Sequence, residues 1–93
     1  MAAWFVYLVQ CRDGSLYARV TTDLVARVRE HNAGRGAKYT RSRRPVRLVW
    51  SVSAPSHSAA LRREAAVKRL PRLEKIALCT GARSEPRVRK IKI

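Results

Sequence analysis

Acidic residues are scarce in this sequence. Only 6 Asp and Glu stand against 21 Lys and Arg, which gives a formal net charge of +15 over 93 residues. Like charges repel one another in a compact fold, so this excess predicts a polyanionic partner. The length allows one compact domain, because a second core would need roughly 50 more residues. The 46% of apolar residues suffices for a modest core and argues against a disordered chain.

Cysteines and long hydrophobic runs are also scarce. The two cysteines, Cys11 and Cys79, have neither CxxC spacing nor nearby histidine pairs, which excludes a zinc site and a disulfide framework. We therefore expect two reduced cysteines and no disulfide partner. The longest apolar run, residues 2–9, is too short to span a bilayer and is not preceded by a basic region. A cytoplasmic protein without a membrane partner is expected.

Two strand patterns stand at the start of the chain. Residues 4–11 are apolar at both parities, which is typical of a central strand covered on two faces. Residues 16–21 alternate, as in a strand with one buried face, and the segment Arg12–Gly14 between them predicts a hairpin turn. A two-residue loop would separate the tyrosines onto opposite faces. A three-residue loop would put on one face Tyr7, Tyr17 and Arg19.

The middle of the chain predicts one helix, one loop and one strand. A first helix is expected over residues 23–33, capped by Thr21 or Thr22. The next segment, 34–45, has loop composition and begins with a helix-ending glycine. A third strand is expected over 46–52.

The last part of the chain predicts two more helices. Ser56 or Ser58 can cap a helix to about residue 70, and Pro71 opens another that Gly81 ends. The order β-β-α-β-α-α predicts an α+β fold, a small three-stranded antiparallel sheet flanked by helices, in one domain over residues 1–81. Residues 82–93 form a basic C-terminal tail, with disorder as one interpretation.

A long stretch of the chain is free of acidic residues. No Asp or Glu occurs from His31 through Arg63, and Tyr39 lies in the same stretch as an aromatic ring for base stacking. This pattern predicts nucleic-acid contact rather than an ordinary solvated loop. The basic residues in the stretch are Arg35, Lys38, Arg41, Arg43, Arg44, Arg47, Arg62 and Arg63.

Three ionisable residues stand at informative positions on the helices. Arg27 and His31 are four residues apart and lie along one border of the buried stripe. Glu64 falls on the core-facing stripe of its helix, where a carboxylate is costly unless it is paired or holds a cation. A local salt bridge to Lys68 is one interpretation, worth about 0.3–0.5 kcal/mol when exposed. A divalent metal is the other, since Mg²⁺ is held by one or two carboxylates plus substrate oxygens.

These residues together resemble the GIY-YIG nuclease superfamily. The resemblance covers the chain from Trp4 to about Leu78 and is most specific to the small, single-domain, YhbQ-like (UPF0213-type) bacterial branch. It rests on five ordered segments. They are Trp4-Phe5-Val6-Tyr7-Leu8, Asp13-Gly14-Ser15-Leu16-Tyr17, His31-Asn32-Ala33-Gly34, Gly36-Ala37-Lys38-Tyr39-Thr40-Arg41, and Ala60-Leu61-Arg62-Arg63-Glu64 before Val67-Lys68.

The resemblance implies phosphodiester hydrolysis with one divalent metal, Mg²⁺ or Mn²⁺. Glu64 would be the metal ligand and Arg27 would clamp the scissile phosphate. Tyr17 would deprotonate or orient the attacking water with support from Tyr7, or the two tyrosines would exchange these roles. A phenol with a pKa of about 10 is a poor base, so the scheme needs cations nearby. His31 would polarise Tyr17, contact phosphate, or only cap its helix.

Two departures from the family pattern bear on these expectations. Arg19 stands where the second motif has glycine. Its side chain would either add a phosphate contact or fill the pocket and exclude metal and water. The other departure is an asparagine that many members carry beyond the metal-binding helix. The only asparagine here is Asn32, before that helix, and the small branch often lacks the residue.

The leading hypothesis is a divalent-metal-dependent endonuclease acting on DNA, with single-stranded DNA as one option. The alternative is a nucleic-acid-binding module of the same fold that has lost cleavage through Arg19. A basic RNA- or ribosome-associated protein would explain the charge, but not the inward position of Glu64. The residues predicted to contact nucleic acid are Arg19, Arg35, Lys38, Tyr39, Arg41, Arg43 and Arg44.

Overall fold

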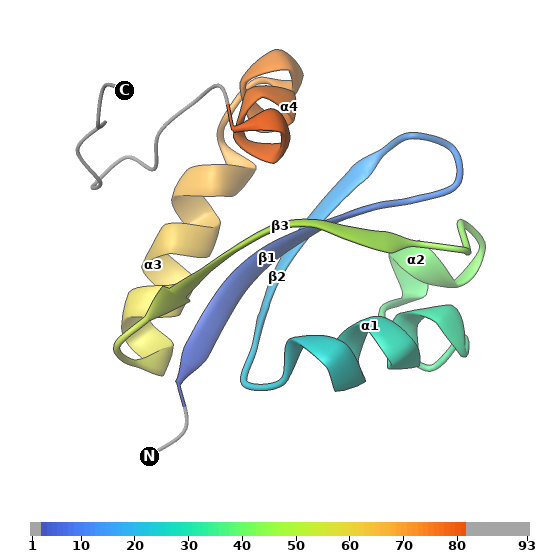
Figure 1. Cartoon of the computed structure of the whole chain (residues 1–93), viewed down its shortest axis with the longest axis horizontal. Coiled ribbons are helices and arrows are strands. Elements are labelled where there is room, and N and C mark those ends of the chain that lie inside the picture. Colours follow the sequence, from blue (N-terminus) through green and yellow to red (C-terminus); the bar gives the residue numbers. More distant parts are fainter. Residues whose placement is uncertain (1–2, 82–93) are drawn as a thin grey trace.

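The computed structural model of the chain describes residues 3–81. Its elements confirm the predicted α+β order with one addition, the short helix α2 inside the expected loop (Figure 1). The predicted tail over 82–93 lies outside the described residues. In chain order the elements are β1 (Trp4–Gln10), β2 (Leu16–Thr21), α1 (Leu24–Asn32), α2 (Lys38–Arg41), β3 (Arg47–Ala54), α3 (His57–Lys68) and α4 (Arg72–Thr80).

The sheet is antiparallel with the strand order β2-β1-β3. Its central strand is β1, as predicted, because both of its faces are apolar. Tyr7 pairs with Arg19 and Val9 with Tyr17, the register of a three-residue loop. The backbone N–H of Cys11 donates to the carbonyl of Ser15 at 2.9 Å and closes that loop. Both tyrosines and Arg19 therefore lie on one face of the sheet.

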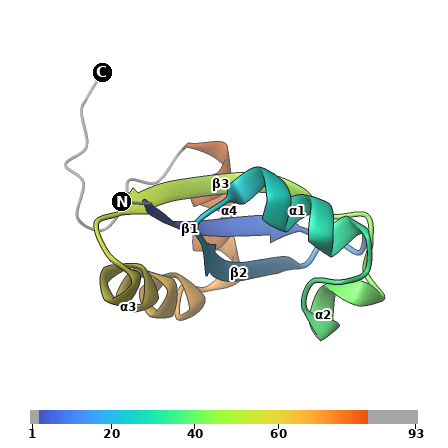
Figure 2. The same cartoon turned by 90° about the horizontal axis from the view of Figure 1, so that it is seen from below.

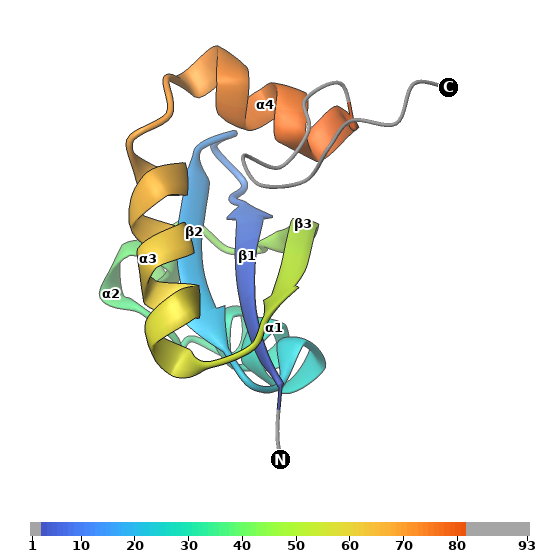
Figure 3. The same cartoon turned by 90° about the vertical axis from the view of Figure 1, so that its left-hand side faces the viewer.

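Helices cover both faces of the sheet. Tyr7 and Val9 pack with Leu24 and Val28 of α1 on one face. On the other face the apolar side chains of β1 and β2 pack with α3 and α4, through residues such as Val67 and Leu78. Figure 2 shows α1 in front of the sheet and α4 behind it. Figure 3 shows α3 running beside β2, so the edge strand β2 lies between the two helical layers.

Local signals set the helix ends, with one correction. The first helix is capped by Asp23 and not by Thr21 or Thr22, because the Asp23 carboxylate accepts from the N–H of Ala26 at 3.0 Å. Ser56 caps α3 and accepts from the N–H of Ala59 at 3.1 Å, and Pro71 and Gly81 flank α4 as predicted.

Residues 3–81 include both cysteines and all the helices named above. Both cysteines are free thiols, Cys11 buried and Cys79 half-buried. In this described part, no helix combines the length and the apolar character that crossing a membrane requires.

Candidate active site at the edge of the sheet

The candidate site is built around the edge strand β2. Tyr17 and Arg19 project from β2 on the face that α1 covers, and α1 adds Arg27 and His31 there. Glu64 belongs to α3 in the other layer and meets the same edge through Arg19. The fold thus brings together all five residues predicted as catalytic: Tyr7, Tyr17, Arg27, His31 and Glu64.

His31 is fully buried, whereas the sequence pattern placed it only along the border of the buried stripe. Its Nε2 lies 3.0 Å from the Tyr7 hydroxyl and its Nδ1 lies 2.8 Å from Oγ1 of Thr40. With no exposed surface, His31 cannot contact phosphate directly, and its side chain is not an exposed helix cap. Its contact with Tyr17 is an edge-to-face ring packing at 5.9 Å between ring centres.

Burial sets the protonation state of His31 and Tyr7. Desolvation lowers the pKa of His31, as do the positive charges of Arg27 and Arg19, while Glu30 opposes them. Desolvation raises the pKa of Tyr7, against the hydrogen bond and charge of Arg27. Tyr7 is fully buried. At neutral pH the pair is therefore an uncharged phenol beside an uncharged imidazole.

Tyr17 is the phenol nearer to solvent. It is half-buried, and its hydroxyl accepts a hydrogen bond from Nη1 of Arg19 at 3.0 Å. Its ring stacks on Tyr39 at 5.2 Å between centres and an interplanar angle of 9°. The guanidinium of Arg43 lies 3.9 Å from the centre of the Tyr39 ring and pairs with Asp13 at 3.1 Å. Tyr39, predicted as a platform for bases, is therefore already stacked against protein groups.

Glu64 faces inward, as predicted, and is only 9% exposed. Its Oε2 is 3.5 Å from Nε of Arg19 and 3.4 Å from Nζ of Lys68. The predicted local salt bridge to Lys68 is therefore present, with Arg19 as a second cation on the same oxygen. Arg19 connects the Tyr17 hydroxyl with the Glu64 carboxylate across the sheet edge and occupies the space between them.

The donor set fits only a lightly held metal ion. Within residues 3–81 there is no group of three or more His, Cys, Asp or Glu side chains that could enclose one. One carboxylate suits an ion that arrives with substrate phosphates and water, as Mg²⁺ commonly does. Arg19 and Lys68 compete with such an ion for Glu64.

Arg27 of α1 lies beside Tyr7 of β1. Its Nη1 pairs with Oε1 of Glu30 at 2.8 Å, and this contact together with Tyr7 raises the pKa of the guanidinium. The Arg27 side chain is 29% exposed. It is thus anchored on the protein and still accessible to an anion.

The basic segment around α2 divides into paired and unpaired cations. Arg12, Arg41 and Arg44 line a hollow of about 480 Å³. In the described part of the chain none of these three is within ion-pair distance of a carboxylate, whereas Arg43 is paired. The guanidinium of Arg44 donates to two backbone carbonyls. Its Nε lies 2.8 Å from the carbonyl oxygen of Arg41, and its Nη1 lies 3.3 Å from that of Asn32. The other predicted contacts here, at positions 35 and 38, are exposed.

Two residues of the site were missed by the sequence analysis, Thr40 and Gly36. Thr40 is fully buried and bonds to His31. Gly36 packs against the His31 ring, where a Cβ would overlap Nδ1 and lie 2.9 Å from the His31 Cα. Both belong to the segment Gly36–Arg41, whose loop composition concealed a buried role.

Substituting Gly36 with alanine should displace the His31 ring. The added methyl group must move His31 or the backbone, so we expect a loss of about 1–3 kcal/mol in the free energy of unfolding. Chemical denaturation measures this, and NMR reports a change at the His31 ring. The control is Gly14→Ala, where a Cβ meets open space and only the positive φ of +88° is strained. Equal effects on the His31 ring in both variants would contradict the packing role of Gly36.

Buried neutral His31 should make stability depend on pH. Because its pKa is lower in the folded chain than the unfolded value near 6.5, protonation favours the unfolded state. The free energy of unfolding should fall as the pH drops below about 6.5, and this contribution levels off below the folded pKa. Urea titrations between pH 8 and pH 5 measure the fall. His31→Gln should be less stable at pH 8 and should lose less on acidification; an equal fall would contradict this assignment.

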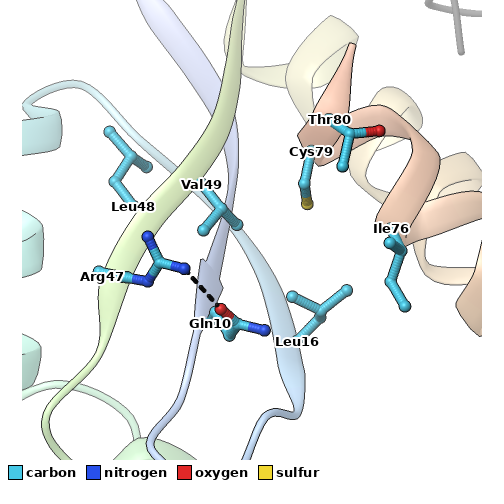
Figure 4. A pocket seen from close by; sticks show the side chains of 8 residues that line it. All are labelled: Gln10, Leu16, Arg47, Leu48, Val49, Ile76, Cys79 and Thr80. Carbon is cyan, nitrogen blue, oxygen red and sulfur yellow. Dashed lines mark hydrogen bonds between the residues drawn. The ribbon is translucent and has the colours of Figure 1, made fainter. Parts of the chain in front are cut away.

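A second hollow lies away from these residues. It has a volume of about 420 Å³ and lies between the sheet and α4 (Figure 4). Its one guanidinium, Arg47, donates to Gln10 at 3.1 Å, and its remaining lining is largely apolar. None of the predicted site residues lines it, so the chemistry concentrates at the β2 edge.

Comparisons with known proteins agree with this geometry. Residues 3–76 match the GIY-YIG catalytic domain family. A UPF0213 protein of Cupriavidus pinatubonensis is 50% identical over 76 residues, which cover 82% of this chain and 84% of that protein. A UPF0213 protein of Staphylococcus haemolyticus is 49% identical over 84% of this chain and 95% of its own length.

A solved structure supports the same assignment. The solution NMR structure of a UPF0213 protein from Bacillus halodurans superposes with a TM-score of 0.54 at 45% identity, covering 84% of this chain and 83% of that one. Since the family match and these relatives span most of the chain, this protein belongs to the GIY-YIG family, within its UPF0213 group.

Proposed function

We propose that this protein is a divalent-metal-dependent endonuclease that hydrolyses DNA phosphodiester bonds, with single-stranded DNA as the favoured form. The observation that carries the proposal is that Arg19 joins Tyr17 and Glu64 at the β2 edge, while Arg27 lies beside Tyr7 on the sheet face that also carries Tyr17. The membership in the GIY-YIG family supports a nuclease-type site. The excess of basic charge supports a nucleic-acid substrate.

In this mechanism each residue has a task that its environment suits. Arg27 binds the scissile phosphate through the exposed part of its guanidinium and stabilises the charge that develops there. Tyr17, the phenol nearer to solvent, orients the attacking water through its hydroxyl group, to whose oxygen Arg19 donates a hydrogen bond. Tyr7 and His31 are buried, so they act by holding Arg27 and Tyr17 in place.

Glu64 would hold the metal ion. A bound Mg²⁺ or Mn²⁺ neutralises phosphate charge and eases departure of the leaving oxygen. Glu64 reaches the site at the β2 edge and is already a partner for cations, because its Oε2 lies between Arg19 and Lys68.

A second candidate function follows from Arg19. The guanidinium pairs with Glu64 and bonds to Tyr17, so the protein's own cation lies between the two groups that a metal and a water would use. This arrangement favours a nucleic-acid-binding module that has lost cleavage.

One assay separates the two functions. Purified protein is incubated with end-labelled single-stranded, duplex and branched DNA, with Mg²⁺, with Mn²⁺ and with a chelator. Metal-dependent nicking supports the endonuclease, with single-stranded DNA cut fastest. Binding without nicking under every condition supports the binding module, and absence of binding would overturn both.

The arginines of the α2 segment should differ in their effect on DNA binding. Arg41→Ala and Arg44→Ala should each lower the salt slope of binding by about 0.7–0.9, because each guanidinium would neutralise one phosphate. Arg43→Ala should change the slope little, since its charge is already paired with Asp13. Binding isotherms between 50 and 300 mM salt measure these slopes, and a larger loss for Arg43→Ala would contradict the assignment.

A further inference from the structure

A buried chain of hydrogen bonds runs behind the candidate site, from β1 through α1 to α2. The Tyr7 hydroxyl lies 3.0 Å from Nε2 of His31, and Nδ1 lies 2.8 Å from the Thr40 hydroxyl. That hydroxyl donates to the carbonyl of Ala37 at 3.0 Å. Tyr7, His31 and Thr40 have no exposed surface, so each proton needs a partner within the protein.

The Tyr7 end of the chain fixes its direction. Among residues 3–81 the Tyr7 hydroxyl has one hydrogen-bond partner that can accept a proton, Nε2 of His31, and the positive charge of Arg27 acts on it from nearby. A guanidinium only donates, so the proton of Tyr7 can go only to His31. Nε2 of His31 must therefore present a lone pair to Tyr7.

The Thr40 end is compatible with the same direction. The Thr40 hydroxyl can donate to the carbonyl of Ala37 at 3.0 Å, which leaves a lone pair on Oγ1 for a proton on Nδ1 of His31. The Tyr7 end therefore selects a neutral His31 with its proton on Nδ1, and Thr40 offers the acceptor that this tautomer needs.

The opposite tautomer leaves a proton without a partner. With the proton on Nε2, His31 would donate to the Tyr7 oxygen. The proton of Tyr7 would then have no acceptor within bonding distance among residues 3–81. A buried donor without an acceptor costs about 1–3 kcal/mol, which disfavours this arrangement.

We propose that Thr40 is a positioning residue of the active site, which fixes the tautomer of His31 so that Tyr7 donates inward and keeps a lone pair for Arg27. The inference rests on the proposed function, because Arg27 is the residue that would bind the scissile phosphate. It couples the α2 segment, which carries the unpaired arginines, to the orientation of the phosphate clamp on α1.

The test compares Thr40→Val with Thr40→Ser in the full-length chain. Valine has the shape of threonine without an acceptor, whereas serine keeps the hydroxyl. Two-dimensional ¹H–¹⁵N spectra of the imidazole ring report which nitrogen carries the proton. The chain has two histidines, and His57→Gln identifies the signals of His31.

We expect the wild type and Thr40→Ser to show the proton on Nδ1. Thr40→Val should lose that single tautomer, and its rate of DNA cleavage should fall about tenfold, the usual scale for a supporting hydrogen bond. Thr40→Ser should cleave within about twofold of wild type. Wild-type His31 with its proton on Nε2, or with two protons at neutral pH, would overturn the inference. So would Thr40→Val with an unchanged tautomer and unchanged cleavage.

Failure of the proposed function gives a different pattern. A protein that never cuts DNA overturns the nuclease, while the wild-type spectrum still decides the tautomer. If Thr40→Val does not fold, the wild-type and Thr40→Ser spectra still test the proposal, because both should show the His31 proton on Nδ1.

Discussion

Replacing Glu64 with glutamine should lower the rate of metal-dependent cleavage by about 100-fold or more, while DNA binding is retained. Among residues 3–81, Glu64 is the carboxylate that pairs with Arg19 at the β2 edge, and an amide of the same size holds a divalent ion poorly. The substitution also leaves Arg19 and Lys68 without their shared partner, so affinity for DNA should stay equal or rise. Cleavage rates with Mn²⁺ and binding isotherms measure the two effects.

The matched control for this change is Glu74→Gln. It removes the same charge from an exposed position at the start of α4, away from the β2 edge. Its cleavage rate should equal that of the wild type. If Glu64→Gln still cut in a metal-dependent manner, the assignment of Glu64 would be wrong, and a contaminating nuclease would need to be excluded.

Replacing Arg19 with glycine, the residue of the family motif, should raise cleavage about tenfold. Arg19 pairs with Glu64 at 3.5 Å and is 44% exposed, so removing it strengthens metal binding by at most about 1 kcal/mol, or about fivefold. The space opened beside Tyr17 adds to this gain, because substrate and water can then approach the strand. The metal concentration for half-maximal cleavage should fall accordingly. Glycine in a strand costs about 0.5–1 kcal/mol of stability.

Arg47→Gly is the control for Arg19→Gly. It makes the same substitution on the other edge strand, where Arg47 is exposed and bonds to Gln10. We expect no gain in cleavage from it. A loss of cleavage in Arg19→Gly would instead show that Arg19 contacts phosphate, and an unchanged rate would show that Arg19 does not limit cleavage.

The hairpin and the helix ends could be predicted because their signals are local. Alternation in residues 16–21 and the turn at Arg12–Gly14 determined which strand residues share a face, given the loop length. The capping serine Ser56 and the flanking Pro71 act on neighbouring backbone groups, so the helix starts they set can be predicted from the sequence. The inward position of Glu64 followed from helical periodicity alone.

The missed features depend on tertiary contacts that the local sequence pattern does not show. Thr40 and Gly36 lie in a segment with loop composition, and their roles exist only because α2 folds back onto His31. Tyr39 was predicted to be free for base stacking because its stacking partner, Tyr17, lies on β2, 22 residues earlier in the chain. The burial of His31 has the same origin, since a helix border becomes core only when another element covers it.

By itself the sequence predicted a basic α+β domain with an inward carboxylate on a helix, and its five ordered segments gave the resemblance to the GIY-YIG family. Composition, periodicity and motif residues are properties of the chain alone, so they suffice for this much. The structure decided the loop length of the hairpin, and with it that the two tyrosines share one face of the sheet. Only the tertiary structure decided how the basic charge is used. Arg19 bridges Glu64 and Tyr17, Arg43 is paired with Asp13, and Arg41 and Arg44 have no carboxylate partner among residues 3–81. The reason is that a side chain's partner depends on which other elements the fold brings within a few ångströms of it.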